Sequence, residues 1–146
     1  MPAQTTIVCD AAWDERTRRG VWAVGRDDDD STMLWSVVSE LRSAPAAETS
    51  GLLAAMSLAL TSAAGCEGGV RVLSDCQGAI TQMVKVAEGR ADAAASLPDW
   101  IARALLCYAP LRMVDGRLVF GDPAVFGDRL GVAWTRPRRR SICASP

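Results

Sequence analysis

The chain has 146 residues, of which 49% are hydrophobic and 23% charged, and its formal net charge is −1 at pH 7. This length predicts one domain with its own core, and the near-neutral charge excludes a strong overall attraction to nucleic acid. The chain has no histidine, which excludes Ser-His and Cys-His catalytic pairs and argues against a Cys/His zinc site.

The five cysteines are Cys9, Cys66, Cys76, Cys107 and Cys143. Their number is odd and none forms a CxxC pair, so we expect reduced and mostly buried thiols in a cytosolic protein. The N-terminus shows no secretory signal, and no apolar run reaches the roughly 18 to 20 residues that span a bilayer. The sequence therefore predicts a soluble cytoplasmic protein, and a monomer is favoured.

Three strands are predicted at the start of the chain, over residues 4–10, 20–25 and 32–38. Short polar connections join them, which predicts an antiparallel meander. The first strand ends at Asp10. The acidic run Asp27–Asp30 falls in the second connection, where a solvated turn is favoured over a metal site.

A helix is predicted next, from about residue 46 to 64, because Leu52, Met56 and Leu60 follow the spacing of one helical face. Glu48 lies one turn before Leu52 on that face. Residues 70–74 then read as a short buried strand. A second helix is predicted over residues 76–87.

The last part of the chain predicts a helix, two extended segments and a final helix, over residues 91–108, 111–114, 117–120 and 126–134. Pro98 either starts or interrupts the first of these helices, and Pro137 stops the last. An Arg-rich tail, 138–146, follows, so the predicted domain covers residues 1–137.

Four acidic residues fall at predicted strand ends or in first helical turns: Asp10, Glu48, Asp75 and Asp128. Carboxylates at such places can converge on one rim of a sheet, where they repel each other unless a divalent cation lies between them. Each acid alone has a structural explanation, as a turn former, a helix cap or a first-turn residue, and Asp122 could replace Asp128. Their occurrence together favours a metal site.

The element order and these acids resemble the ribonuclease H-like fold, and within it the single-domain type 1 ribonuclease H family. The segment Leu73-Ser74-Asp75-Cys76-Gln77-Gly78-Ala79-Ile80 is similar to the family's strand-to-helix segment. The resemblance implies an α/β fold with a mixed five-stranded sheet, three antiparallel strands followed by parallel strands, flanked by helices.

The same resemblance implies hydrolysis of the RNA strand of RNA–DNA hybrids with two Mg²⁺ or Mn²⁺ ions. Asp10 would bridge both ions, Glu48 and Asp75 would hold one, and Asp128 would hold the other. Glu48 would also approach the 2′-hydroxyl that distinguishes RNA from DNA.

The chain departs from the family pattern at Asp10-Ala11-Ala12, where the family has Asp-Gly-Ser, and in the loop 121–127, which lacks the family's histidine. The residues expected to contact nucleic acid are Ala11, Trp13, Gln77, Arg136 and Arg138. All of these except Ala11 have an alternative role without nucleic acid. Trp13 could pack in the core and Gln77 could be an ordinary residue of the first helical turn, while the two arginines could belong to a solvated tail. A structure-selective nuclease, such as a resolvase or exonuclease, and a non-catalytic nucleic-acid-binding module are the alternative functions.

Overall fold

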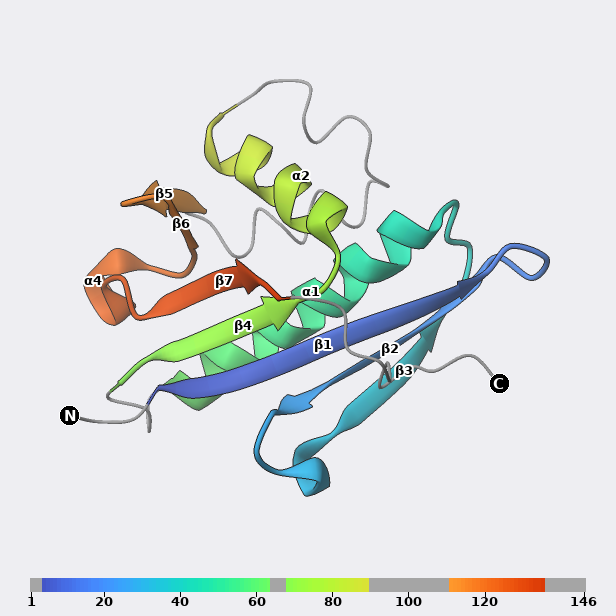
Figure 1. Ribbon diagram of the computed structural model, residues 1–146, viewed down its shortest axis with the longest axis horizontal. Helices are drawn as coiled ribbons and strands as arrows, with labels where there is room; N and C mark the ends of the chain where they lie inside the picture. The colour runs from blue at the N-terminus through green and yellow to red at the C-terminus, as the bar shows by residue number, and fades with distance from the viewer. Residues whose placement is uncertain (1–3, 64–67, 90–110, 136–146) are drawn as a thin grey trace.

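The computed structural model describes residues 4–63, 68–89 and 111–135 (Figure 1). It is an α/β structure with one mixed seven-stranded sheet in the order β3-β2-β1-β4-β7-β6-β5. The strands are β1 Thr5–Asp14, β2 Arg19–Arg26, β3 Leu34–Val38, β4 Val70–Ser74, β5 Arg112–Val114, β6 Arg117–Val119 and β7 Leu130–Trp134. The helices of the described residues are α1 Ala44–Ser62, α2 Gln77–Ala87 and α4 Pro123–Phe126, with a 3-10 turn, η1, at Asp30–Thr32.

The predicted α/β class and the antiparallel β1–β2–β3 meander are confirmed, whereas the predicted count of five strands is wrong. β1 also continues four residues beyond its predicted end. Its pairing with β2 runs on to Asp14 opposite Arg19, because the hairpin keeps the two strands hydrogen-bonded after the apolar run has ended. Asp10 therefore lies within a strand and not at its end.

The predicted final helix over residues 126–134 is wrong, since α4 ends at Phe126 and Leu130–Trp134 forms strand β7. β7 is paired on both sides, in parallel with β4 and antiparallel with β6. Its burial alternates, with Leu130 and Val132 buried and Gly131 between them half-buried, which is the period of a strand. Gly127, with φ of 56°, ends α4.

The two extended segments predicted after residue 110 are strands β5 and β6, which pair as a hairpin around Asp115-Gly116. Both turn residues have positive φ, 49° and 78°, as a two-residue hairpin turn requires. The predicted helix 91–108 and the tail 138–146 lie outside the described residues. No helix of the described residues has the length and apolar character that crossing a membrane requires.

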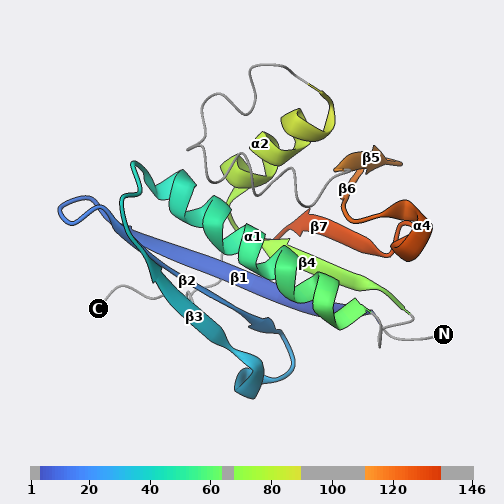
Figure 2. The same cartoon turned by 180° about the vertical axis from the view of Figure 1, so that it is seen from behind.

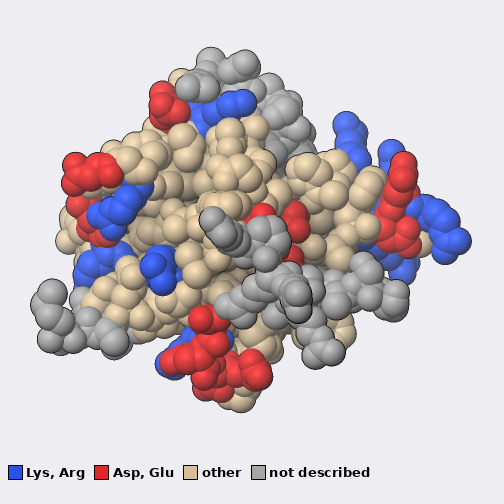
Figure 3. Space-filling view, viewed as in Figure 1, with Lys and Arg blue, Asp and Glu red and all other residues tan. Residues whose placement is uncertain are grey.

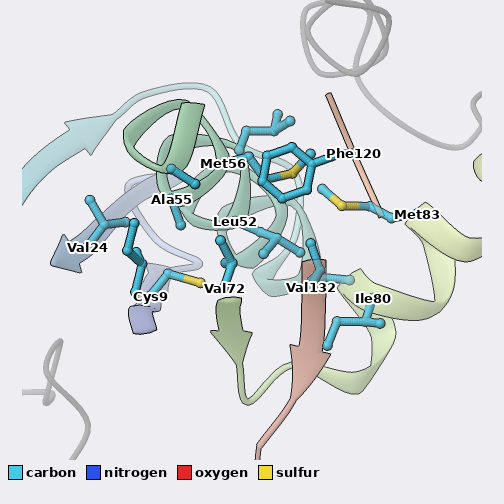
Figure 4. Packing of buried hydrophobic residues seen from close by; sticks show 14 of the residues in the cluster. Cys9, Val24, Leu52, Ala55, Met56, Val72, Ile80, Met83, Phe120 and Val132 are labelled. Atoms are coloured by element: carbon cyan, nitrogen blue, oxygen red, sulfur yellow. The ribbon is translucent and has the colours of Figure 1, made fainter. Parts of the chain in front are cut away.

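Helix α1 covers one face of the sheet (Figure 2). Its N-cap Ser43 accepts a hydrogen bond from the Ala46 amide at 3.2 Å, and Pro45 occupies the first turn. The core lies between this helix, α2 and the sheet, and Figure 4 shows Leu52 and Met56 from α1 packed with Val72, Met83 and Phe120. This packing fixes α1 against the central strands β1 and β4, where the candidate site lies.

Candidate metal centre

Three of the four predicted acids come together in the structure. Asp10 on β1, Glu48 on α1 and Asp75 just after β4 each offer a carboxylate oxygen, and these oxygens lie within 4.8 Å of one another. Asp10 is buried, with 7% of its surface exposed, while Glu48 and Asp75 are half-buried. Residues separated by 27 or more positions in sequence therefore form one compact group of hard oxygen donors.

The sheet brings Asp10 and Asp75 side by side. β1 and β4 run parallel, and their last paired residues are Cys9 and Ser74, so the two acids occupy the next position on each chain. β4 ends there while β1 continues beside β2. Ser74 is fully buried, and its Oγ accepts a hydrogen bond from the Cys76 amide at 3.1 Å, which turns the chain away from the sheet and into α2.

Gly51 allows α1 to bring Glu48 to the same place. A Cβ atom at position 51 would lie 3.2 Å from the Trp22 Cβ and 3.4 Å from the Asp10 carbonyl oxygen, so a larger side chain would push the helix off the strand. Glu48 is three residues earlier and thus on the same side of α1. A glycine within a predicted helix is the sequence signal for this close approach, although Gly51 is not among the predicted site residues.

The site gathers three carboxyl groups in a partly buried place. Burial, together with the nearby charges of Asp10 and Asp75, raises the pKa of Glu48 from 4.5 to about 8. The Asp10 Oδ1 accepts a hydrogen bond from the Ala11 amide at 2.9 Å. A divalent cation among the three oxygens would reverse the repulsion and keep Glu48 ionised.

Cys9 and Cys76, the two cysteines among the described residues, are free thiols, as expected. Burial is the main reason that the pKa of each is raised, and the site's acids add to the effect. The Cys9 thiol donates to the Leu73 carbonyl at 3.4 Å. Both thiols thus stay protonated near neutral pH, and neither belongs to the donor group, which consists of carboxylates alone. The other three cysteines lie outside the described residues.

Asp128 does not join the site. It precedes β7 by two residues, at the end of the sheet where Leu130 pairs with Val70, whereas Asp75 follows the opposite end of β4. The length of β4 alone separates those ends by roughly 13 Å. Asp128 is half exposed and forms an ion pair with Arg112 at 2.8 Å. The prediction failed because it placed Asp128 on a helix that does not form.

Among the described residues, the acids considered as substitutes for Asp128 also lie away from the site. Asp122 caps α4, where its Oδ1 accepts a hydrogen bond from the Ala124 amide at 2.9 Å, so it lies at the same distant end of the sheet. Residues 135–146, which follow β7, contain no Asp or Glu. The acidic run Asp27–Asp30 lies in the predicted turn between β2 and β3, and there Asp29 caps η1.

The residues predicted to contact nucleic acid do not lie in one common environment. The Trp13 indole donates to the Leu41 carbonyl at 3.2 Å and packs against the core, so it has a structural role. Ala11 lies beside Gly51. Gln77 is exposed at the start of α2, two residues after Asp75. Arg136 and Arg138 lie outside the described residues.

The molecular face drawn in Figure 3 shows acidic side chains near its middle, while the visible Lys and Arg side chains lie toward its margins. In comparisons with known proteins, no family model matches the chain, and no curated protein matches it in sequence.

Proposed function

We propose that this chain is a metal-dependent endonuclease that hydrolyses the RNA strand of RNA–DNA hybrids, on a ribonuclease H-like fold. The convergence of Asp10, Glu48 and Asp75 from three separate elements carries the proposal. The strand order supports it, because a meander followed by the parallel strands β4 and β7 agrees with the sheet that the sequence resemblance implies.

The donor set fits Mg²⁺ or Mn²⁺. It contains carboxylate oxygens and neither histidine nor thiolate, which is the ligand chemistry of hard divalent cations. Asp10, Glu48 and Asp75 would hold the ion, which when bound would lower the pKa of a coordinated water and offset charge on the phosphate. Because Asp128 is distant, we propose one resident ion and not the two that the resemblance implies.

The chain's own groups account for binding and selectivity in this proposal. Glu48 is half-buried beside Asp10, and a carboxylate held there could accept a hydrogen bond from a ribose 2′-hydroxyl, which DNA lacks. The exposed Gln77 follows Asp75 closely and could donate to the nucleic acid. Burial of Asp10 excludes water from one side of the cluster and strengthens its attraction for a cation.

A non-catalytic binding module is the main competitor from another functional class. The raised pKa of Glu48 argues against it, because burial beside Asp10 and Asp75 makes ionisation of this carboxyl destabilising in a fold that binds no cation there. A nuclease for branched or single-stranded substrates would use the same metal site, so only its substrates distinguish it.

Cleavage of a labelled RNA–DNA hybrid tests the proposal, with Mg²⁺, Mn²⁺ or EDTA and with DNA duplex and branched DNA as parallel substrates. Metal-dependent cutting confined to the RNA strand would support the proposed activity. Cutting of branched DNA alone would indicate the structure-selective alternative. Binding without any cutting would indicate the non-catalytic module.

A further inference from the structure

Strand β3 forms one edge of the sheet and is unusually apolar for an edge. It pairs with β2 alone among the described residues. Trp35 and Val37 share one of its faces and are 71% and 51% exposed, and Leu34 on the other face is 55% exposed. Residues 33–38 include no charged residue and no proline, although edge strands are commonly protected by such residues against pairing with other chains.

The two ends of this edge carry opposite charge. Near the start of β3, the turn with Asp27–Asp30 sets four acids against Arg26, which pairs with Asp28 at 3.3 Å. Beside the end of β3, where Val38 pairs with Gly20, lies the β1–β2 hairpin. Its exposed arginines, Arg16, Arg18 and Arg19, outnumber its acids, Asp14 and Glu15. Arg42 and Glu40, also exposed at this end, balance each other.

Figure 3 shows these two groups at separate margins of the molecule, the acidic one at the bottom and the Arg-rich one at the right. An antiparallel pairing of two identical edges reverses one chain relative to the other. It therefore sets each acidic turn beside the partner's Arg-rich hairpin, whereas a parallel pairing would set like charges together.

We propose that β3 binds the β3 strand of a second copy of this chain, antiparallel and about a twofold axis near Ser36. Such a pairing is self-complementary, so each residue meets its symmetry mate or an equivalent position. It would satisfy the edge amides and carbonyls and cover Trp35 and Val37 of both copies. This inference rests on the edge strand alone and is independent of the proposed nuclease activity.

Light scattering coupled to size-exclusion chromatography tests the pairing over a series of protein concentrations. The full chain is expected to reach twice its monomer mass of 15.5 kDa. Trp35→Lys/Val37→Lys should leave only monomer, because lysines on the edge oppose pairing. Val125→Lys is the matched control at a 61% exposed site on α4, and it should dimerise like the parent.

A parent chain that stays monomeric throughout the series, or a lysine variant that still dimerises, would overturn the proposal. A second variant tests the pairing independently, in case the lysine variant fails to fold. Ser36→Cys places one thiol near the proposed axis, so a short bismaleimide should cross-link it into a dimer. Thr61→Cys, exposed on α1, should not cross-link above the unmodified chain. Equal cross-linking of both variants would also contradict the pairing.

Discussion

Gly51 of α1 lies directly against the main chain of Asp10, since a Cβ atom at position 51 would stand 3.4 Å from the Asp10 carbonyl oxygen. This contact sets the distance between the helix that carries Glu48 and the strand that carries Asp10. The geometry of the site thus depends on a residue that offers no ligand atom.

Enlarging Gly51 should damage both the fold and the site. Gly51→Val is expected to destabilise the protein by about 1–3 kcal/mol through overpacking and to weaken Mg²⁺ binding by moving Glu48. In Gly51→Ala, a helix-propensity gain of about 1 kcal/mol should offset much of the milder crowding. Urea unfolding and a Mg²⁺ titration measure the two effects.

Gly78 is the matched control, because a Cβ atom there would meet nothing within 4 Å. Gly78→Val should leave the Mg²⁺ affinity unchanged. If Gly51→Val binds Mg²⁺ as tightly as Gly78→Val does, the close approach of α1 to β1 does not position Glu48.

Without metal, stability should fall as the pH rises from about 4.5 to about 8. The folded-state pKa of Glu48 is raised to about 8, so the folded protein holds a proton that the unfolded chain releases near 4.5. The stabilisation that this bound proton gives is complete below the pKa of Glu48 in the unfolded chain. It is lost as the pH rises past the pKa of Glu48 in the folded protein. Denaturant midpoints measured across this range in EDTA test the slope.

Two controls identify Glu48 as the source of that slope. Glu48→Gln cannot titrate at this position and should flatten it. Saturating Mg²⁺ should also flatten it, because a bound cation keeps the carboxylate ionised in the folded protein. A slope that persists in Glu48→Gln would assign the pH dependence to other groups.

The free protein should bind one Mg²⁺ or Mn²⁺ per chain, since three carboxylates converge at a single place. Isothermal titration calorimetry with Mn²⁺ gives the stoichiometry directly. Two ions bound with similar affinity in the absence of nucleic acid would contradict the single-ion site and require a further ligand.

Asp128→Asn should leave Mg²⁺ binding unchanged. The substitution removes an exposed ion pair with Arg112, which is worth about 0–1 kcal/mol of stability. Arg112 would keep its hydrogen bonds to the Gly121 and Gly127 carbonyls. A large loss of metal affinity in Asp128→Asn would mean that this acid reaches the site after all.

The local sequence was sufficient to predict the meander, α1 and the grouping of Asp10, Glu48 and Asp75, because strand period, helix period and turn residues agreed there. It was insufficient around Asp128. Residues 130–134 are a short apolar run that fits a helix or a buried strand, and the pairing with β4 and β6 decides between them. Asp128 lies at the far end of the sheet because residues 130–134 form strand β7 and not the predicted helix.

The continuation of β1 beyond Asp10 could not be predicted either, because it also depends on pairing with a neighbouring strand. Hydrophobic alternation ends near Asp10, and only the hydrogen bonds to β2 carry the strand to Asp14. The pKa of Glu48 depends on burial and on the spacing of three acids that are distant in sequence, so it also required the fold.

The role of the three carboxylates is tested by cleavage of a labelled RNA–DNA hybrid by Asp10→Asn and by the parent chain, with hybrid binding measured in parallel. Asp10 is the most buried of the three acids, and the substitution removes a metal ligand together with one negative charge facing the phosphate. We expect the parent chain to cut the RNA strand, and the variant to bind the hybrid as well or more tightly without cutting it. Cleavage by Asp10→Asn at the parent's rate would contradict the three-carboxylate site.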